Sequence, residues 1–226
     1  MRPGGQRIQN AAVLTDHWPL LGLSLTTERL RLRLATDDEL AELAELAARG
    51  VHPPDEQPFL HVWTDGTPAE LARGVVQRAW RRRGTWRPTD WKLDLTVFVD
   101  EHPVGVQELC ARDFGVLREV YTTSWLGLAH HGRGIGVEMR AAVLHLAFAG
   151  LGATDASTLS FVDNPAPLAV SRRLGYRPDG IIRDARRGEA VVSERLRLTV
   201  ADWNSVARPE VRIEGLEPCL PLFGLA

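Results

Sequence analysis

Hydrophobic and polar residues change their spacing several times along the chain, and each change predicts a new element. Residues 28–35, ERLRLRLA, place an apolar residue at every second position, which is typical of a half-buried β-strand. The following TDDELAELAELAA takes up the helical period, and Thr36 and Glu39 have the spacing of a capping box. The pattern therefore predicts a strand that leads directly into an amphipathic helix.

A second helix is predicted after a proline-rich loop over residues 49–66. The helix, residues 67–83, begins with another capping box, Thr67 and Glu70, and ends in the three arginines 81–83. Cations at a helix C-terminus complement the helix dipole, and we prefer this interpretation. A nucleic-acid contact beside the nearby tryptophans is the weaker alternative.

Further along, the pattern predicts three strands, a helix, a strand, a helix and a final hairpin. The ranges are strands 91–99 and 102–109 joined at Asp100-Glu101, strand 118–128, helix 136–150, strand 156–162, helix 164–176, and a hairpin turning at Arg187-Gly188. One α/β domain with a mixed sheet accounts for this order. We expect a loose arm over residues 1–23, the domain over 24–203, and a tail over 204–226 packed on the domain.

Composition excludes several classes of function. The formal net charge is −2, so the chain as a whole lacks the excess of positive charge that is typical of proteins that bind nucleic acid or an anionic membrane. Cys110 and Cys219 belong to no CxxC pair and no Cys/His cluster, so we expect no metal site and no disulfide framework. The sequence has no apolar signal core and no apolar run of membrane-spanning length. These features predict a soluble cytoplasmic protein.

A glycine-rich loop precedes the predicted helix 136–150. Gly132, Gly134 and Gly136 alternate with Arg133 and Ile135, and glycines at a helix N-terminus let an anion approach the unpaired N–H groups. The Walker pattern GxxxxGK[ST] is missing, and GxGxG differs from the Rossmann GxGxxG. A turn that only connects a strand to a helix is the remaining alternative.

Three segments resemble one family in the right order. HGRGIG resembles the pyrophosphate loop Q/R-x-x-G-x-G/A of the GCN5-related N-acetyltransferases (GNAT), with His131 in the first position. DNPAPLAVSRRLGYRPDG resembles the family's N-x-x-S…LGF…G segment; Asn164, Leu174, Gly175, Tyr176 and Gly180 match, and Pro167 replaces the serine. TTERLRLRLATDDEL and SWLGLAHHGRGIG resemble the RimJ/RimL-like branch. The resemblance spans residues 24–203 and implies a mixed, mostly antiparallel central sheet with a splayed strand pair and flanking helices.

The resemblance implies transfer of an acyl group from acetyl-CoA, or another short acyl-CoA, to a primary amine of a small molecule or a peptide N-terminus. It also assigns cofactor contacts. Those for the pantetheine arm are Trp125, Leu126, Gly127 and Leu128, with Asn164 and Ser171 on its far side; those for the pyrophosphate are His131, Gly132, Arg133, Gly134, Ile135, Gly136 and Val137.

Acyl transfer to an amine needs a base that removes the amine proton, and an acid that protonates the departing thiolate assists it. A primary amine has a pKa of about 10 and must lose a proton before it attacks. Glu119 and Tyr121 share a strand face with Trp125, and Glu108 ends the preceding strand, so these three are candidates for the base. Ser171 lies where many relatives have a tyrosine that protonates the thiolate, which makes it a candidate acid.

Several points stay open in the sequence. A succinyl donor would need a cationic partner, for which Arg112, Arg118 and His130 are candidates. A non-catalytic acyl-CoA sensor and a nucleotide-dependent oxidoreductase are the competing functions. The tryptophans of the insertion 49–91 are expected in the core, or along an aromatic acceptor cleft that a second subunit of a homodimer could close.

Overall fold

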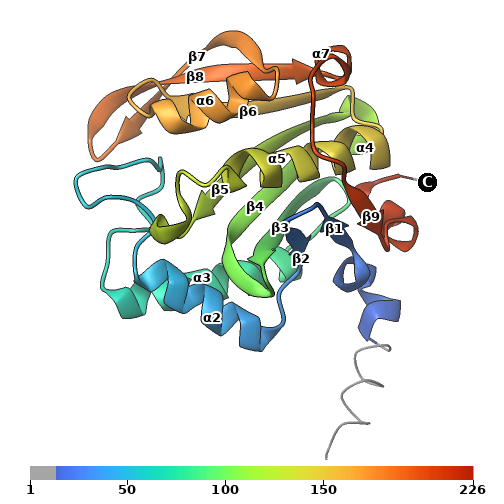
Figure 1. Ribbon diagram of the computed structural model, residues 1–226, viewed down its shortest axis with the longest axis horizontal. Coiled ribbons are helices and arrows are strands. Elements are labelled where there is room, and N and C mark those ends of the chain that lie inside the picture. Colours follow the sequence, from blue (N-terminus) through green and yellow to red (C-terminus); the bar gives the residue numbers. More distant parts are fainter. Residues whose placement is uncertain (1–13, 226) are drawn as a thin grey trace, which may run out of the picture.

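The computed structural model describes residues 14–225, and their strands form one twisted sheet (Figure 1). Its strand order is β7-β8-β6-β5-β4-β3-β2-β1-β9, with every neighbouring pair antiparallel except β5 and β6. The strands are β1 (Ser24–Thr26), β2 (Arg31–Arg33), β3 (Asp90–Val99), β4 (His102–Arg112), β5 (Glu119–Leu126), β6 (Asp155–Phe161), β7 (Arg177–Arg186), β8 (Glu189–Thr199) and β9 (Arg212–Glu214).

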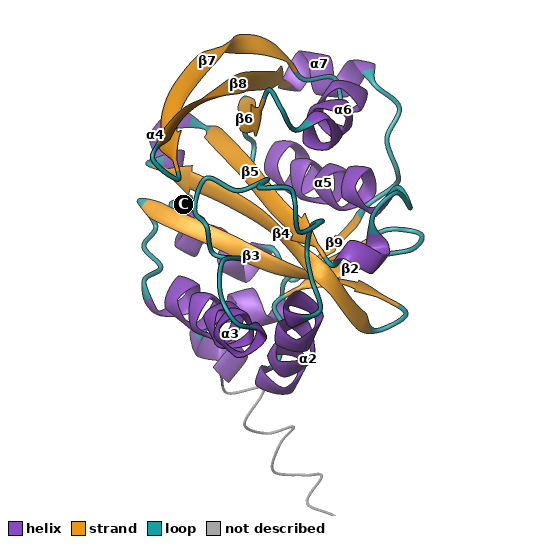
Figure 2. Ribbon diagram, turned by 90° about the vertical axis from the view of Figure 1, so that its left-hand side faces the viewer, coloured by secondary structure: helices purple, strands orange, loops and turns teal. Residues whose placement is uncertain are grey.

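Helices cover both faces of this sheet, with α5 and α6 on one side and α2 and α3 on the other (Figure 2). The α-helices are α2 (Asp37–Ala48), α3 (Pro68–Gly84), α4 (Phe114–Leu117), α5 (Ile135–His145), α6 (Pro165–Arg173) and α7 (Val200–Ser205); the shorter turns are η1 (Pro19–Gly22), η2 (Leu128–His130), η3 (Leu146–Gly150) and η4 (Glu217–Phe223). Two apolar clusters result: a large one that includes α5, and a smaller one that includes Leu40 and Leu43 of α2 and Val75 of α3.

The elements that local sequence signals predict are present in the structure. Both capping boxes are present, with the Thr36 side chain accepting from Glu39 N and the Thr67 side chain accepting from Glu70 N. The β3–β4 hairpin turns at Asp100-Glu101, where both residues have positive φ, as tight hairpin turns require. The β7–β8 hairpin turns at Arg187-Gly188 in the same way.

Two predicted elements differ from the structure. The strand expected over residues 28–35 is shortened to β2 (Arg31–Arg33), because Thr27 N donates to Leu30 O and the Thr27 hydroxyl accepts from Leu30 N, which closes a turn between β1 and β2. The predicted helix 136–150 is α-helical only to His145 and continues as the π-helical turn Leu146–Gly150.

The two ends of the described chain meet at the β1 edge of the sheet. In the tail, β9 pairs with β1, with Leu25 opposite Ile213, and Cys219 and Phe223 are buried. Leu20 and Leu23, at the end of the predicted arm, are buried too, whereas residues 1–13 of that arm lie outside the described residues. The sheet is therefore longer by two short strands than the sequence pattern indicated.

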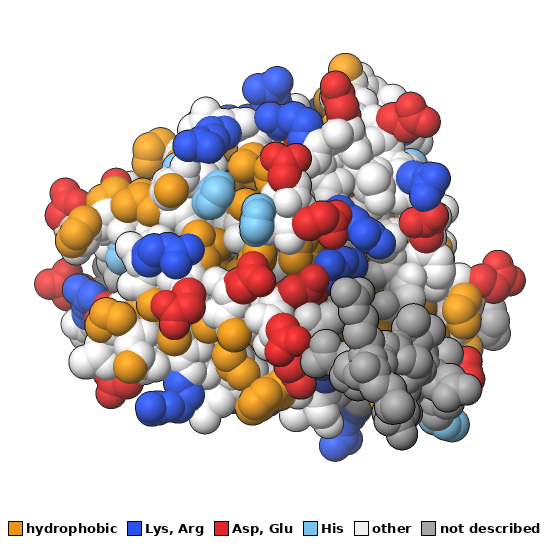
Figure 3. All heavy atoms as spheres, turned by 60° about the horizontal axis from the view of Figure 1, so that its bottom comes forward, with side chains coloured by type: hydrophobic (Ala, Val, Ile, Leu, Met, Phe, Trp, Pro, Cys, Tyr) orange, Lys and Arg blue, Asp and Glu red, His pale blue; other side chains and the backbone are white. Residues whose placement is uncertain are grey.

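The surface is mixed in charge. On the face in Figure 3, acidic and basic side chains are interspersed, so no single sign dominates there. Within residues 14–225, no helix combines the length and the apolar character needed to cross a bilayer. The same residues contain no cluster of three potential metal ligands, and both cysteines are buried free thiols.

The strands β5 and β6 separate soon after they meet. Their parallel ladder has three residue pairs and ends at Tyr121 and Ser157. Beyond this point β5 stays paired with β4 as far as Leu126, and β6 stays paired with β8 as far as Phe161. The splayed pair and the mostly antiparallel sheet implied by the family resemblance are thus confirmed.

Candidate active site

The glycine loop lies directly before α5 and presents the start of that helix to the surface. Gly132 and Gly134 have φ values of +72° and +77°, a region that glycine enters without strain. A Cβ on Gly132 would meet nothing within 4 Å, and residues 131–134 are all exposed. The first N–H groups of an α-helix have no acceptor within the helix and carry a partial positive charge. This arrangement can bind an anion such as a pyrophosphate.

Arg29 holds the loop in place. Its Nη1 donates to the carbonyl of Arg133 (3.2 Å), and its Nε donates to Glu138 Oε2 (2.7 Å). The Thr27 hydroxyl donates to the other oxygen of Glu138 (2.6 Å). The acidic residue in the first turn of α5 is therefore neutralised by Arg29. The side chain of Arg133 has no hydrogen-bond or ion-pair partner within residues 14–225, so it can face a bound anion.

The other predicted cofactor residues surround the opening between β5 and β6. Trp125 and Leu126 lie on β5 beyond the splay, and His131 Nε2 lies 3.1 Å from Leu126 O. Asn164 is the residue before α6, and its side chain has no hydrogen-bond partner among the described residues. A Cβ on Gly136 would lie 3.9 Å from Val170 Cγ2, which shows how closely α5 and α6 approach. The strand β5, the glycine loop and the start of α6 therefore lie around this opening.

Ser171 is less accessible than its predicted role needs. It is fully buried, accepts a hydrogen bond from Arg140 Nη1 (2.8 Å) and donates to the carbonyl of Pro167 (2.9 Å). Because its hydroxyl proton is already given to a backbone carbonyl, these contacts favour a packing role over an acid that protonates a thiolate.

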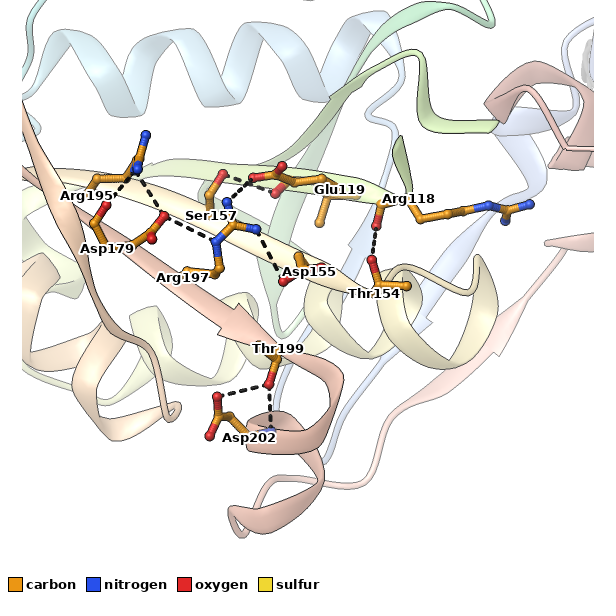
Figure 4. Close-up of polar contacts among 11 residues, drawn as sticks. Arg118, Glu119, Thr154, Asp155, Ser157, Asp179, Arg195, Arg197, Thr199 and Asp202 are labelled. Atoms are coloured by element: carbon orange, nitrogen blue, oxygen red, sulfur yellow. Dashed lines mark hydrogen bonds and ion pairs between the residues drawn. The ribbon is translucent and has the colours of Figure 1, made fainter. Parts of the chain in front are cut away.

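Glu119 belongs to an ion-pair network on the sheet surface (Figure 4). It lies 3.6 Å from Arg197, which also pairs with Asp155 (3.2 Å) and Asp179 (3.2 Å). Glu119 is opposite Asp155 at the closed end of the β5–β6 pair, two residues before the splay. This position disfavours Glu119 as the base.

A cavity of about 530 Å³ lies between the sheet and the helices α2 and α3. Most of its floor is three rows of cross-strand neighbours, whose side chains share one face of the sheet. The rows are Lys92–Cys110–Tyr121, Asp94–Glu108–Thr123 and Thr96–Val106–Trp125, each running from β3 through β4 to β5. Tyr121 and Trp125 line this cavity and also border the opening between β5 and β6. The cavity therefore meets the predicted cofactor site along β5.

A bulge places Glu108 in this cavity. In the β3–β4 ladder Phe98 is opposite Pro103 but Val97 is opposite Gly105, so Val104 is an extra residue. Without it, Glu108 would pair with Leu93 and point into the large core, because a shift of one residue reverses every side chain. With it, Glu108 pairs with Asp94 and faces the cavity.

Two carboxylates and two guanidinium groups form a buried cluster at this point. Arg78 bonds Glu108 and lies 3.5 Å from Asp94, while Arg82 lies 3.4 Å from Asp94 and 3.2 Å from Glu108. Glu108 is only 3% exposed. Burial, and then the charge of Glu108, raise the pKa of the Asp94 carboxyl to about 7 against the opposing effect of both arginines. The pair can thus exchange a proton near neutral pH.

Sequence reasoning named Glu108 but missed Asp94. The available signal was the alternation of Lys92, Asp94 and Thr96 along an otherwise apolar strand. The bulge that aligns Asp94 with Glu108 has a signal too, because Pro103 and Gly105 flank Val104, and proline and glycine inside a strand often mark a bulge.

Tyr121 lies one row away from the two carboxylates. Partial burial raises the pKa of its hydroxyl above the ordinary value, and the neighbouring Cys110 and Glu108 raise it further. Burial likewise raises the pKa of the Cys110 thiol. Both groups therefore keep their protons at neutral pH, and Tyr121 can donate a hydrogen bond.

The wall opposite the sheet is aromatic and is fixed to the β7–β8 hairpin. The ring centroids of Phe59 and Trp63 are 5.2 Å apart, and those of Trp63 and Trp125 are 5.7 Å apart. Arg186 Nη1 donates to Gln57 O (2.6 Å), and Arg187 pairs with Asp65 (2.6 Å). The hairpin tip thus holds the loop that carries Phe59 and Trp63.

The tryptophans of the insertion divide between core and cavity. Trp91 is fully buried and stacks on Trp86, which donates to the carbonyl of Leu222 (2.8 Å). Trp63 and Trp86 line the cavity, and Trp80 is half exposed. The expectation of core packing is therefore correct for Trp91, and the alternative of an aromatic cleft applies to Trp63.

The three candidates for a succinyl carboxylate lie away from this cavity. Arg118 donates to the carbonyl of Leu151 (3.3 Å), Arg112 is exposed at the end of β4, and His130 is in η2. Burial and the charge of Arg133 lower the pKa of His130. The cavity lining contributed by residues 14–225 contains none of the three.

Comparison with known proteins agrees with this geometry. A family model described as an acetyltransferase (GNAT) domain matches residues 29–177, which is more than half of the chain. Among solved structures, RimL, a ribosomal L7/L12 alpha-N-protein acetyltransferase in complex with coenzyme A, is 18% identical; the match covers 78% of this chain and 97% of that one, with a TM-score of 0.61.

Two further structures share the fold. RimJ of Mycobacterium smegmatis, in complex with CoA-disulfide, is 13% identical over 90% of this chain and 95% of its own, with a TM-score of 0.61. A spermidine N-acetyltransferase SpeG chimera from Vibrio cholerae and hSSAT is 15% identical over 79% and 99%, with a TM-score of 0.59. The family match, the splayed strands and the glycine loop lead to one conclusion: the chain belongs to the GNAT family and is an acyl-CoA-dependent N-acetyltransferase.

Proposed function

We propose that this enzyme transfers an acetyl group from acetyl-CoA to the primary amine of a compound bound in the 530 Å³ cavity. One observation carries the proposal: Tyr121 and Trp125 border both the opening between β5 and β6 and the cavity. A donor in the opening and an acceptor in the cavity would therefore meet at β5. Such proximity is itself a large part of catalysis.

The donor-binding residues follow from the contacts at the opening. The N–H groups of Ile135 and Gly136, with the side chain of Arg133, suit a pyrophosphate, whereas the Val137 N–H already donates to Gly134 O (3.2 Å). Beyond Tyr121, β5 has no strand partner on its β6 side. The Thr158 hydroxyl donates to Thr122 O and His131 lies beside Leu126 O, and the backbone between these two carbonyls can pair with an amide-containing arm. Acetyl-CoA supplies the activated thioester. These residues hold it in one orientation.

The Asp94–Glu108 pair is the base in this proposal. Adjacent strands lie about 4.8 Å apart, so Glu108 is one strand from the β5 backbone where the acyl carbon would lie. An amine that enters the cavity can pass its proton to the pair directly or through one water. A carboxyl with a pKa of about 7 suits this task, because a useful fraction is ionised at neutral pH.

Tyr121 supports the leaving group. Its hydroxyl stays protonated at neutral pH and lies on the same sheet face as Glu108. We assign it the hydrogen bond to the departing sulfur, in place of Ser171, whose proton is used by Pro167. Glu119 is not part of this mechanism.

Acetyl is the proposed donor group. The description of the matching family model as an acetyltransferase domain supports it, and the three succinyl candidates from the sequence, Arg112, Arg118 and His130, lie outside the cavity lining formed by the described residues. The family assignment leaves the oxidoreductase and the non-catalytic sensor without support. A cytoplasmic location and a homodimer stay predictions from the sequence.

Calorimetric titration with acetyl-CoA and succinyl-CoA, followed by measurement of thiol release over a panel of amines, tests the proposal. We expect both thioesters to bind through the shared pyrophosphate and acetyl-CoA to support faster turnover. Failure of every CoA thioester to bind would remove the role of the glycine loop. Equal or faster turnover of succinyl-CoA would reject acetyl as the preferred group.

A further inference from the structure

The cavity has an excess of positive charge. Five cationic side chains line it, namely Arg78, Arg81, Arg82, Arg83 and Lys92, against two acidic ones, Asp94 and Glu108. Arg78 and Arg82 are used by the two carboxylates. Arg83 bonds the carbonyl of Ala35 (2.5 Å) and lies 3.8 Å from Asp37. Within residues 14–225, the side chains of Arg81 and Lys92 have no hydrogen-bond or ion-pair partner.

Lys92 stands out among these cations. It is the sole lysine of the sequence, in which every other basic side chain apart from the histidines is an arginine. It is half-buried on β3, in the row that continues through Cys110 to Tyr121. Two strand spacings put its backbone about 10 Å from that of Tyr121. An ammonium half-buried without a counter-charge is costly, and this cost is relieved when an anion binds beside it.

A smaller recess of about 250 Å³ adjoins the cavity at Lys92. The two spaces share Arg82, Trp86 and Lys92, and Arg87 adds another cation to the recess. Asp90 is the single acidic residue in that recess as the described residues form it. The cavity thus extends from Trp125 on β5, past the carboxylate pair on β3 and β4, to Lys92 on β3, where the recess begins.

Building on the proposed function, we propose that the acceptor is an amine joined by an apolar or aromatic body to an anionic group, and that Lys92 binds this anion. The amine lies at Glu108 and Thr123, and a carboxylate or phosphate about 8–10 Å from the nitrogen reaches Lys92, so the body between them lies beside Tyr121 and toward Trp86, which lines both spaces with Lys92. A polyamine does not fit, because its second ammonium would face Lys92 and Arg82.

The test compares acceptors of one shape and different charge, using the full chain with saturating acetyl-CoA. The acceptors are 4-(aminomethyl)benzoate, 4-(aminomethyl)phenylphosphonate, neutral 4-(aminomethyl)benzamide and 1,4-bis(aminomethyl)benzene. We expect both anionic amines to exceed the amide by about tenfold or more in kcat/KM, as one charge-assisted contact provides, and the diamine to be the poorest. The benzoate and phosphonate distinguish a carboxylate from a phosphate acceptor.

Substitutions at Lys92 test whether this residue causes the preference for an anionic acceptor. Lys92→Gln should reduce the ratio of acid to amide to about one and leave kcat/KM for the amide within about threefold, whereas Lys92→Arg should keep the preference. Arg183→Gln is the matched control, because it removes an exposed cation of β7 that does not line the cavity. Its ratio should equal that of the wild type.

The possible outcomes distinguish a failure of the proposed acceptor class from a failure of the proposed acetyltransferase function. Turnover without a preference for the acid, or a preference that survives Lys92→Gln, would overturn the anionic acceptor and leave the acetyltransferase function standing. If acetyl-CoA binds but no amine is turned over, the proposed function fails. In that case, reductive methylation of Lys92, the sole lysine, followed by mass spectrometry, tests whether an anion binds there. Protection of Lys92 by 4-methylbenzoate and not by 4-methylbenzamide supports it, and equal labelling rejects it.

Discussion

The substitution Asp94→Asn tests the proposed carboxylate pair most directly. With a pKa of about 7, the Asp94 carboxyl is about one-tenth ionised at pH 6 and about nine-tenths ionised at pH 8. If the ionised pair accepts the amine proton, kcat/KM should rise about tenfold over this range, with an inflection near pH 7. The wild-type profile is measured with one acceptor whose own protonation is corrected for.

In the variant, Glu108 faces Arg78 and Arg82 without a second negative charge beside it. Because the variant lacks the carboxyl that titrates near pH 7, the inflection there should be lost, and kcat/KM at pH 8 should fall by about tenfold or more. Glu119→Gln is the control, since it removes a carboxylate from the Arg197 network outside the cavity. An inflection that stays near pH 7 in Asp94→Asn would refute the assignment.

Thermal stability gives an independent check of the same pKa. The folded-state pKa of Asp94 lies above its ordinary value of 3.8, so the folded protein holds this proton more tightly than the unfolded chain. The contribution of Asp94 to stability is full below about pH 4, falls as the pH rises, and is lost above about pH 7. The decline of the melting temperature between pH 5 and pH 8 should therefore be smaller in Asp94→Asn than in the wild type.

Four other changes address the remaining parts of the site. Arg29→Ala should raise the Kd for acetyl-CoA by roughly tenfold with little change in kcat, measured by calorimetry and kinetics, because it frees the glycine loop and uncovers Glu138; an unchanged Kd would contradict this. Gly134→Ala and Gly152→Ala place alanine at similar positive φ and should each cost about 1–2 kcal/mol in denaturant unfolding, but only the first should weaken acetyl-CoA binding. Tyr121→Phe should lower kcat about tenfold and leave the Kd for acetyl-CoA unchanged, and full activity would remove its role. Trp63→Ala should raise KM about tenfold for an amine that carries an apolar group toward Trp125, without affecting an amine that lacks such a group, because it removes the ring that packs on Trp125.

Much of the fold follows from local signals. The boxes at Thr36 and Thr67 stop the chain from continuing as strand or loop, because each satisfies helix N–H groups with nearby side chains. The two tight hairpins and the glycine loop are equally local, since their residues tolerate positive φ. The resemblance of the segments around Gly134 and Asn164 then sufficed for the family, and it predicts the place of the donor.

The acceptor side was decided by contacts between distant residues. Val104 is the extra residue of the β3–β4 bulge; Pro103 and Gly105 beside it are residue types that often mark a bulge, but they do not say which residue of β3 then faces Glu108. That bulge turns Glu108 toward Asp94 and away from the core, and Arg78, distant in sequence, then completes the cluster. Ser171 shows the converse, since its position in the sequence favoured catalysis but the packing of α5 against α6 buried it.

There is a physical reason why the sequence predicts some of these features and not others. Caps, turns and helix N-termini depend on atoms within a few residues, so the sequence by itself determined the elements and the anion-binding loop. The register of two strands, the burial of a carboxyl and the pKa that results depend on groups brought together from across the chain. Only the tertiary structure could therefore decide that Asp94, Glu108 and Lys92 share one cavity.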